Sequence, residues 1–204
     1  ASEGGVSRIS PQEWRERPGS VGRPWPGVSV TIHREDGELL GTGETGLVFM
    51  TSPGGKFKYH KDKDKTEAAW QGDSYTLGDV GHLDSDGYLY LTDRSADVVI
   101  RGGVNIYPAE IEQALALHPA VVDCAVFGVP DERSGEALRA LVELRTPTDA
   151  AELAEHCRTH LAAYKCPQEI IEVPELPRDP SGKVRKRHLR DQAWEGQANR
   201  IRID

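Results

Sequence analysis

The chain has 204 residues, of which 37% are hydrophobic, so it can bury the core of one large domain or two small ones. Its 33 acidic residues outnumber its 25 basic ones and give a net charge of −8, which argues against a nucleic-acid-binding surface because phosphate contacts need an excess of Lys and Arg. The sequence has no apolar run near the roughly 20 residues of a membrane-spanning helix and begins without a signal-peptide pattern, so we expect a cytoplasmic protein.

The first part of the chain, residues 18–92, has the sequence pattern of a β-sheet. Short apolar runs alternate with turns that contain Gly and Asp, which predicts a meander of antiparallel strands or a small barrel. We interpret the charged run KFKYHKDKDK (56–65) as a solvated hairpin loop rather than a functional basic patch. The predicted strands are VSVTIH (28–33), GLVFMT (46–51), SYTLGDVGHLD (74–84) and YLYLTD (88–93).

After residue 93 helical and strand-like segments alternate, which predicts an α+β module. PAEIEQALALHP has Pro108 and acidic residues where a helix begins, and a second amphipathic helix carries Leu153 and Cys157 on one side. The domain boundary is predicted near TDRSAD (92–97), which gives domains at 1–93 and 94–204. The predicted elements are helix 108–119, strands 120–129 and 136–145, helix 149–165 and strand 168–177.

Two glycine motifs do not fit a phosphate-binding loop. GTGETG (41–46) satisfies G-x-G-x-x-G but precedes a strand instead of opening a helix. DPSGKV (179–184) lacks the first glycine of that loop and has Val184 where a magnesium-binding Ser or Thr is needed. Lys183 therefore stands on a glycine-tipped turn before a short basic helix, VRKRHLR, and belongs either to a solvated basic tail or to a catalytic finger.

Three further stretches accompany this turn in a fixed order: YTLGDVGHLDSDGYLYLTDRSADVVIRGGVNIYPAEIE (75–112), YKCP (164–167) and ELPRDPSGKVRKRHLR (175–190). Together they resemble the C-terminal portion of the adenylate-forming (ANL superfamily) acyl-CoA synthetases, which are related to firefly luciferase and to the adenylation domains of peptide synthetases. The resemblance covers the chain from about residue 18. It implies that 1–93 is a β-barrel-like subdomain ending a large AMP-binding domain, and that 94–204 is the mobile C-terminal lid domain.

The family pattern implies a ligase that works in two half-reactions. A carboxylate, here a fatty or aryl acid, attacks the α-phosphate of MgATP to give an acyl-adenylate and pyrophosphate, and the thiol of coenzyme A then displaces AMP. The resemblance thus implies ATP, Mg²⁺ and coenzyme A as cofactors. The phosphate loop and acyl pocket of the family are not in this sequence, so the missing N-terminal part of the enzyme is an expected partner, and we expect the chain alone to be inactive.

The resemblance assigns roles to three charged residues. Lys183 matches the lysine that enters the site in the first half-reaction, where a cation offsets the charge that builds as the bond to pyrophosphate breaks. Asp79 matches the aspartate that accepts hydrogen bonds from the ribose hydroxyls, which suits an ionised carboxylate. Arg94 matches the arginine that reaches the nucleotide sugar or phosphate, although by itself it could pair with a surface carboxylate such as Asp93.

Other matches concern the change between the two half-reactions and the metal. Gly102 and Gly103 match the loop of the coenzyme A tunnel, where close backbone approach requires glycine, with a plain turn as the alternative. Ala96 falls at the hinge, where relatives usually have Asp or Lys. Glu3 matches the magnesium-associated glutamate of a Tyr-Gly-x-Thr-Glu motif. Ser134 replaces an aromatic residue common in relatives, which disfavours stacking of the coenzyme A adenine there.

Two alternatives to an acyl-CoA ligase stay open. One is an acyl-AMP ligase that hands its product to a carrier protein, and the other is a non-catalytic nucleotide-binding module with the same fold. RGGVNIYPAEIE (101–112) favours acyl- and aryl-CoA ligases over peptide-synthetase domains. The presence of Asp79, Arg94 and Lys183 together argues against a pure scaffold.

Overall fold

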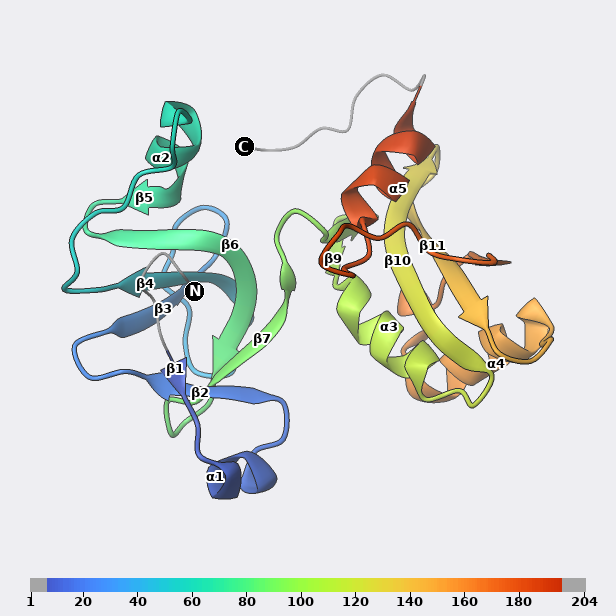
Figure 1. The fold of residues 1–204 in the computed structure, drawn as a ribbon, viewed down its shortest axis with the longest axis horizontal. Coiled ribbons are helices and arrows are strands. Elements are labelled where there is room, and N and C mark those ends of the chain that lie inside the picture. The colour runs from blue at the N-terminus through green and yellow to red at the C-terminus, as the bar shows by residue number, and fades with distance from the viewer. Residues whose placement is uncertain (1–6, 196–204) are drawn as a thin grey trace. The chain divides into compact units, whose positions relative to one another are not determined.

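The computed structural model describes residues 7–195, which form two units that divide between Ala96 and Asp97 (Figure 1). The first unit is built on an antiparallel sheet of seven strands in the order β1-β2-β7-β6-β4-β3, with β5 beside β6. The predicted meander is confirmed, because its four runs match β3, β4, β6 and β7 to within one residue at each end. The strands are β1 (Ser7–Arg8), β2 (Ser20–Pro24), β3 (Ser29–His33), β4 (Gly46–Thr51), β5 (Trp70–Gln71), β6 (Ser74–Leu83) and β7 (Leu89–Arg94).

Two small groups of side chains hold this sheet. Ile32 and Val48 are cross-strand partners on β3 and β4, and they pack with Leu89 of β7 in a buried cluster. Around β5, the rings of Phe57 and Trp70 both lie about 5 Å from the ring of the buried Tyr75, at 5.1 and 4.9 Å between centroids. Aromatic pairs at this spacing stabilise a sheet beyond the area they bury.

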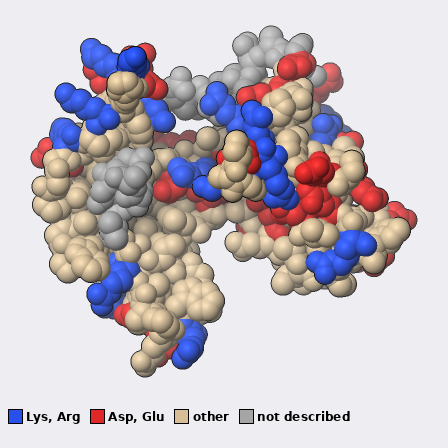
Figure 2. Space-filling model, viewed as in Figure 1, with Lys and Arg blue, Asp and Glu red and all other residues tan. Residues whose placement is uncertain are grey.

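The hairpin-loop interpretation of residues 56–65 is wrong for residues 63–65, where helix α2 (Lys63–Ala69) begins. Asp62 is the N-cap, and its carboxylate accepts a hydrogen bond of 3.0 Å from the Lys65 N–H, which satisfies a free donor of the first turn. The lysines of this segment are exposed, and Figure 2 shows Lys and Arg side chains gathered over α2 and the loop before it. The signal that the sequence interpretation missed was the capping aspartate.

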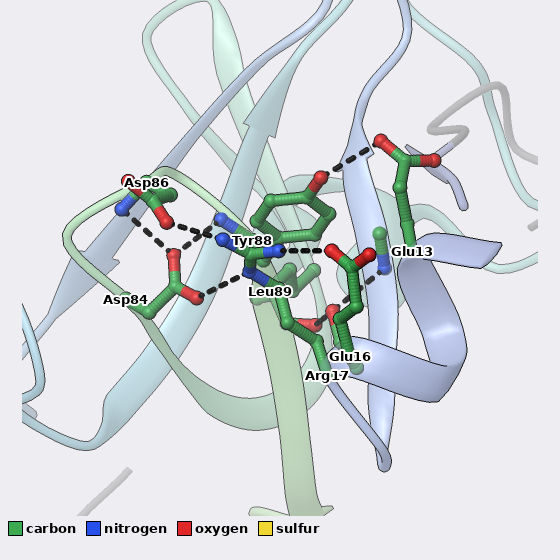
Figure 3. A network of polar contacts seen from close by, with 9 residues as sticks. Glu13, Glu16, Arg17, Asp84, Asp86, Tyr88 and Leu89 are labelled. Carbon is green, nitrogen blue, oxygen red and sulfur yellow. Dashed lines mark hydrogen bonds and ion pairs between the residues drawn. The ribbon is translucent and has the colours of Figure 1, made fainter. Parts of the chain in front are cut away.

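Helix α1 (Pro11–Glu16) is tied to the turn before β7 by a polar network (Figure 3). Ser10 and Glu13 form a capping box, in which the Glu13 carboxylate accepts from the Ser10 N–H at 2.8 Å. The hydroxyl of the buried Tyr88 donates to the same carboxylate at 2.7 Å. Beside it, the Arg17 guanidinium pairs with Asp86 and lies 4.3 Å from the centre of the Tyr88 ring.

This network makes the stability of the first unit depend on pH. Hydrogen bonding to Ser10, with a further bond from Tyr88, lowers the pKa of Glu13 from 4.5 to about 2. The charged form is therefore favoured in the folded state, and its stabilising contribution is present above pH 4.5 and is lost as the pH falls toward 2. We expect Glu13→Gln to lower the urea midpoint at pH 6 and to have a much smaller effect at pH 2.5. A difference between variant and parent that does not change with pH would contradict this.

The second unit is a mixed sheet of five strands in the order β10-β11-β8-β9, with β12 parallel to β11. The predicted α+β pattern is confirmed, but the short hairpin of β8 and β9 was not predicted, and the helix expected over 149–165 ends at His160 before a separate 3₁₀ turn. The elements are β8 (Val99–Arg101), β9 (Val104–Ile106), α3 (Pro108–Ala116), β10 (Val121–Asp131), β11 (Gly135–Leu144), α4 (Ala150–His160), η1 (Ala163–Lys165), β12 (Glu169–Glu172) and α5 (Lys186–Trp194).

Helices cover both faces of the β10–β11 hairpin. Val126 belongs to the main core with Ile111 of α3 and Leu153 of α4, whereas its neighbour Phe127 packs in a second cluster with Leu189 of α5. Successive residues of a strand point to opposite faces, so β10 is apolar on both sides. No helix of residues 7–195 is long and apolar enough to cross a membrane.

Candidate functional site

Lys183 stands on an exposed hairpin formed by residues 177–185, here called the Lys183 hairpin. Arg178 and Val184 pair as an antiparallel bridge, and the Arg185 N–H donates to the Pro177 carbonyl at 2.8 Å to close the base. Gly182 has φ +87°, a left-handed conformation that favours glycine. Among the residues that the structure describes, the Lys183 ammonium makes no hydrogen bond or ion pair, so it is available to an incoming group.

The side chain of Asp179 fixes the shape of this hairpin. Its Oδ1 accepts hydrogen bonds from the Ser181 hydroxyl at 2.6 Å, from the Ser181 N–H at 2.8 Å and from the Lys183 N–H at 3.1 Å. These bonds, above all that of the Ser181 hydroxyl, lower the pKa of Asp179. The turn that carries Lys183 is thus held by its own polar groups, as expected for an Asp-Pro-Ser-Gly turn.

Asp79 and Arg94 lie side by side in the first unit. They are cross-strand partners on β6 and β7, and the Arg94 Nε lies 2.9 Å from the Asp79 Oδ1. A second bond runs from Arg94 Nη1 to the Leu77 carbonyl at 2.8 Å. Toward Asp93, the Arg94 backbone N–H donates a hydrogen bond to Oδ1 at 2.8 Å. The two residues assigned to the nucleotide therefore form one preformed polar group, in which Arg94 is exposed and Asp79 is partly buried.

An irregularity of β6 presents Asp79 at this point. The pairing with β4 shifts register between Leu47 and Phe49, whose partners on β6 are Val80 and Thr76, so β6 has extra residues and a bulge between these partners. Gly78 sits in the bulge with φ +77°, which a β-branched or larger residue would adopt only with strain. Bulges commonly re-aim a side chain next to a functional site.

Gly102 and Gly103 form the two-residue turn between β8 and β9. Their φ values of +58° and +81° match a type I′ turn, which requires a left-handed conformation at both central positions. A Cβ on either glycine would meet nothing within 4 Å among the described residues. The local reason for these glycines is thus backbone conformation, and the close approach of a ligand remains a prediction.

The turn of Gly102 and Gly103 is braced from two sides. The Gly102 N–H donates to the Ser134 carbonyl at 2.8 Å, and the Arg101 guanidinium donates to the Tyr164 carbonyl at 2.9 Å. The neighbouring Lys165 of the YKCP stretch binds both carboxylate oxygens of Glu110 on α3, at 2.6 and 2.7 Å. The sequence interpretation had given this lysine no role.

Ala96 is the last residue of the first unit, and Asp97 is the first of the second. Asp97 lies 3.8 Å from the guanidinium of Arg190, which is buried in α5. The assignment of Ala96 as the hinge stays a prediction. Glu3, assigned to magnesium, lies outside the described residues, and within residues 7–195 no group of His, Cys, Asp and Glu side chains could hold a metal ion.

Comparison with known proteins connects this geometry to a family. The AMP-binding enzyme C-terminal domain family matches residues 110–183. The 2-succinylbenzoate–CoA ligase of Bacillus subtilis is 37% identical over 91% of this chain, and the human mitochondrial acyl-coenzyme A synthetase ACSM4 is 39% identical over 88% of it. The chain spans 38% and 33% of the lengths of these relatives.

Solved structures give the same result. The o-succinylbenzoate CoA synthetase of Bacillus subtilis, in complex with its acyl-adenylate intermediate, has a TM-score of 0.85 and 35% identity over 91% of this chain and 38% of its own. An amide bond synthetase from Marinactinospora thermotolerans has a TM-score of 0.82 and 36% identity over 92% of this chain and 39% of its own. Residues 110–183 therefore match the AMP-binding enzyme C-terminal domain, and about nine tenths of the chain are similar in sequence and fold to part of the adenylate-forming enzymes.

Proposed function

We propose that this chain is the carboxyl-terminal part of an ATP-dependent acyl-CoA ligase, which activates a carboxylic acid as its acyl-adenylate and transfers the acyl group to coenzyme A. The observation that carries the proposal is the Lys183 ammonium, which makes no hydrogen bond or ion pair among residues 7–195 and stands on a turn that is held by its own hydrogen bonds. A polypeptide in which this chain follows an N-terminal adenylation core is called the full-length ligase below.

In the first half-reaction, Lys183 would stabilise the negative charge that develops between the substrate carboxylate and the leaving pyrophosphate. A fixed cation is most effective when it need not reorganise during the reaction, and the hydrogen-bonded hairpin meets that condition. The Asp79 carboxylate would accept hydrogen bonds from the ribose hydroxyls, and Arg94 would hold that carboxylate in place. The residues described here form no magnesium site, so no step is assigned to the metal in this chain.

In the second half-reaction, the turn of Gly102 and Gly103 would face the thiol-bearing arm of coenzyme A. The names of the relatives favour this acceptor, since the 2-succinylbenzoate, long-chain fatty acid and sulfoacetate enzymes are all CoA ligases. One solved structure with the same fold is an amide bond synthetase, and its name favours a different acyl acceptor, an amine. A comparison of coenzyme A, a carrier protein and an amine as acceptors distinguishes these possibilities.

The proposal is tested by measuring both half-reactions in the full-length ligase. We expect exchange of labelled pyrophosphate into ATP that depends on a fatty or aryl carboxylic acid, followed by thioester formation when coenzyme A is added. The isolated chain serves as the control and should catalyse neither reaction. Absence of acid-dependent exchange with every acid of a broad panel, in a folded full-length protein, would exclude the proposal.

The nucleotide role of Asp79 gives a separate prediction. We expect Asp79→Asn in the full-length ligase to raise the KM for ATP by about tenfold, because hydrogen bonds to a charged acceptor are stronger than neutral ones. The KM for the carboxylic acid should stay within twofold. Asp73→Asn is the matched control, since Asp73 pairs with Lys56 at 3.8 Å elsewhere in the same unit. Equal effects of the two substitutions would refute the role.

A further inference from the structure

We propose that Arg178 is a positioning residue for the adenylation step, which holds the Lys183 hairpin against the sheet so that the ammonium keeps a fixed direction. The inference rests on the proposed function. Arg178 lies at the start of the hairpin, and its side chain contacts both the sheet and the tip of the hairpin. Its Nη2 lies 2.6 Å from Asp123 Oδ2 and 3.2 Å from Glu143 Oε1, while its Nη1 donates to the Gly182 carbonyl at 3.2 Å.

The two carboxylates that bind Arg178 are also held in place by backbone N–H groups. Asp123 Oδ1 accepts from the Cys124 N–H at 2.8 Å, and Glu143 Oε1 accepts from the Leu176 N–H at 2.6 Å. Asp123 and Glu143 are also direct cross-strand partners on β10 and β11. Like charges at such positions repel, so the guanidinium both neutralises the pair and gains a rigid binding site.

The hairpin needs such an anchor because its own bonds do not determine its direction. Figure 1 shows the segment between β12 and α5 crossing β10 and β11 before it turns. Asp179 and the backbone bonds fix the shape of the turn, whereas the Gly182 carbonyl, directly before Lys183, is bound by Arg178. On the other flank, Lys186 lies 3.2 Å from Glu112 of α3.

Direction matters more for Lys183 than for an ordinary surface residue. A displacement of about 1 Å of a catalytic group can cost about 100-fold in rate, even when the fold is intact. Arginine suits the task because its planar guanidinium can bind two carboxylates and a carbonyl at once, whereas a lysine offers a single point charge. The bond to Asp123 also raises the pKa of Arg178, which keeps the anchor charged.

The test is Arg178→Gln in the full-length ligase. We expect the rate of acid-dependent pyrophosphate exchange to fall at least tenfold with the KM for ATP unchanged within twofold. Thioester formation from supplied acyl-adenylate and coenzyme A should stay within twofold of the parent. Arg178→Lys should recover part of the lost exchange rate, because lysine keeps the positive charge but lacks the planar guanidinium that binds several groups at once.

A matched control is Arg139→Gln. Arg139 on β11 pairs with Glu169 at 2.6 Å and is 31% exposed, against 33% for Arg178, but among the described residues it forms no hydrogen bond or ion pair with the Lys183 hairpin. This variant should leave both half-reactions unchanged. Equal losses in both half-reactions for Arg178→Gln would overturn the inference, because they indicate a general loss of structure. If thermal unfolding shows that Arg178→Gln does not fold, Asp123→Asn is used as the test variant instead. It removes one of the two carboxylates that bind Arg178, and the same comparison of half-reactions applies.

Lys183→Ala, measured in parallel, separates this inference from the proposed function. If Lys183→Ala slows exchange and Arg178→Gln does not, the positioning role is wrong and the proposed function stands. If Lys183→Ala leaves exchange unchanged, the catalytic role of Lys183 is wrong and this inference fails with it. The proposed function fails only if the parent enzyme itself shows no acid-dependent exchange.

Discussion

Replacing Lys183 by alanine in the full-length ligase is expected to slow acyl-adenylate formation by about 100- to 1,000-fold, which is the usual cost of removing one preorganised group that stabilises developing charge. Thioester formation from supplied acyl-adenylate should change by less than about threefold, since no phosphoanhydride bond breaks in that step. Both rates are measured on one enzyme preparation, the first by pyrophosphate exchange and the second by release of AMP.

The structural basis of this prediction is the contrast between Lys183 and the other cations around it. Arg178, Lys186 and Arg190 each form an ion pair with a carboxylate of the second unit, whereas the ammonium of Lys183 forms no ion pair among the described residues. A side chain without a structural partner can be removed at little cost to stability. The alanine variant should therefore unfold at the same temperature as the parent, within about 2 °C.

Arg187→Ala is the control for a general loss of positive charge. Arg187 lies four residues further along the chain, its side chain is 86% exposed, and it forms an ion pair with Asp191 on the same helix at 3.5 Å. Its removal should leave both half-reactions within twofold. Similar losses for Arg187→Ala and Lys183→Ala would mean that long-range electrostatics, and not a specific contact, explains the effect.

Much of the fold was predictable because its elements have clear sequence periods. The strands of the first unit are short apolar runs between turns that contain Gly and Asp, and α3 begins at Pro108 with Glu110 in its first turn, as a helix N-terminus should. The short β8 and β9 were missed because three residues are too few to show a period. Helix α2 was missed because its charged residues outweighed the capping signal of Asp62.

The candidate site was predictable only as single residues. Asp79 and Arg94 could be matched to a motif, but their ion pair depends on the register of β6 and β7 and on the bulge at Gly78. The ion pairs that anchor the Lys183 hairpin could not be predicted from the sequence, because Asp123 is 55 residues from Arg178 and Glu143 is 35 residues from it. Contacts at such separations follow from tertiary packing and leave no local pattern.

Replacing Gly103 by leucine should have the opposite selectivity to Lys183→Ala. We expect thioester formation from supplied acyl-adenylate to fall by about 100-fold, because a leucine on the turn would displace the approaching thiol arm from its reactive position. Pyrophosphate exchange should fall by less than about threefold. The side chain has room in the second unit itself, since a Cβ at Gly103 meets nothing within 4 Å among residues 7–195, so its effect should come from the ligand that approaches.

The backbone strain of this substitution requires its own control, because Gly103 has φ +81° and a leucine there costs about 1–2 kcal/mol. Gly43→Leu carries the same strain, since Gly43 also has φ +81° and nothing within 4 Å of a Cβ, but it lies in a turn of the first unit. Both variants should lose similar thermal stability, and only Gly103→Leu should lose thioester formation. A Gly103→Leu enzyme with normal thioester formation would show that this turn does not face the thiol, and Gly102 and Gly103 would then be explained by the type I′ turn alone.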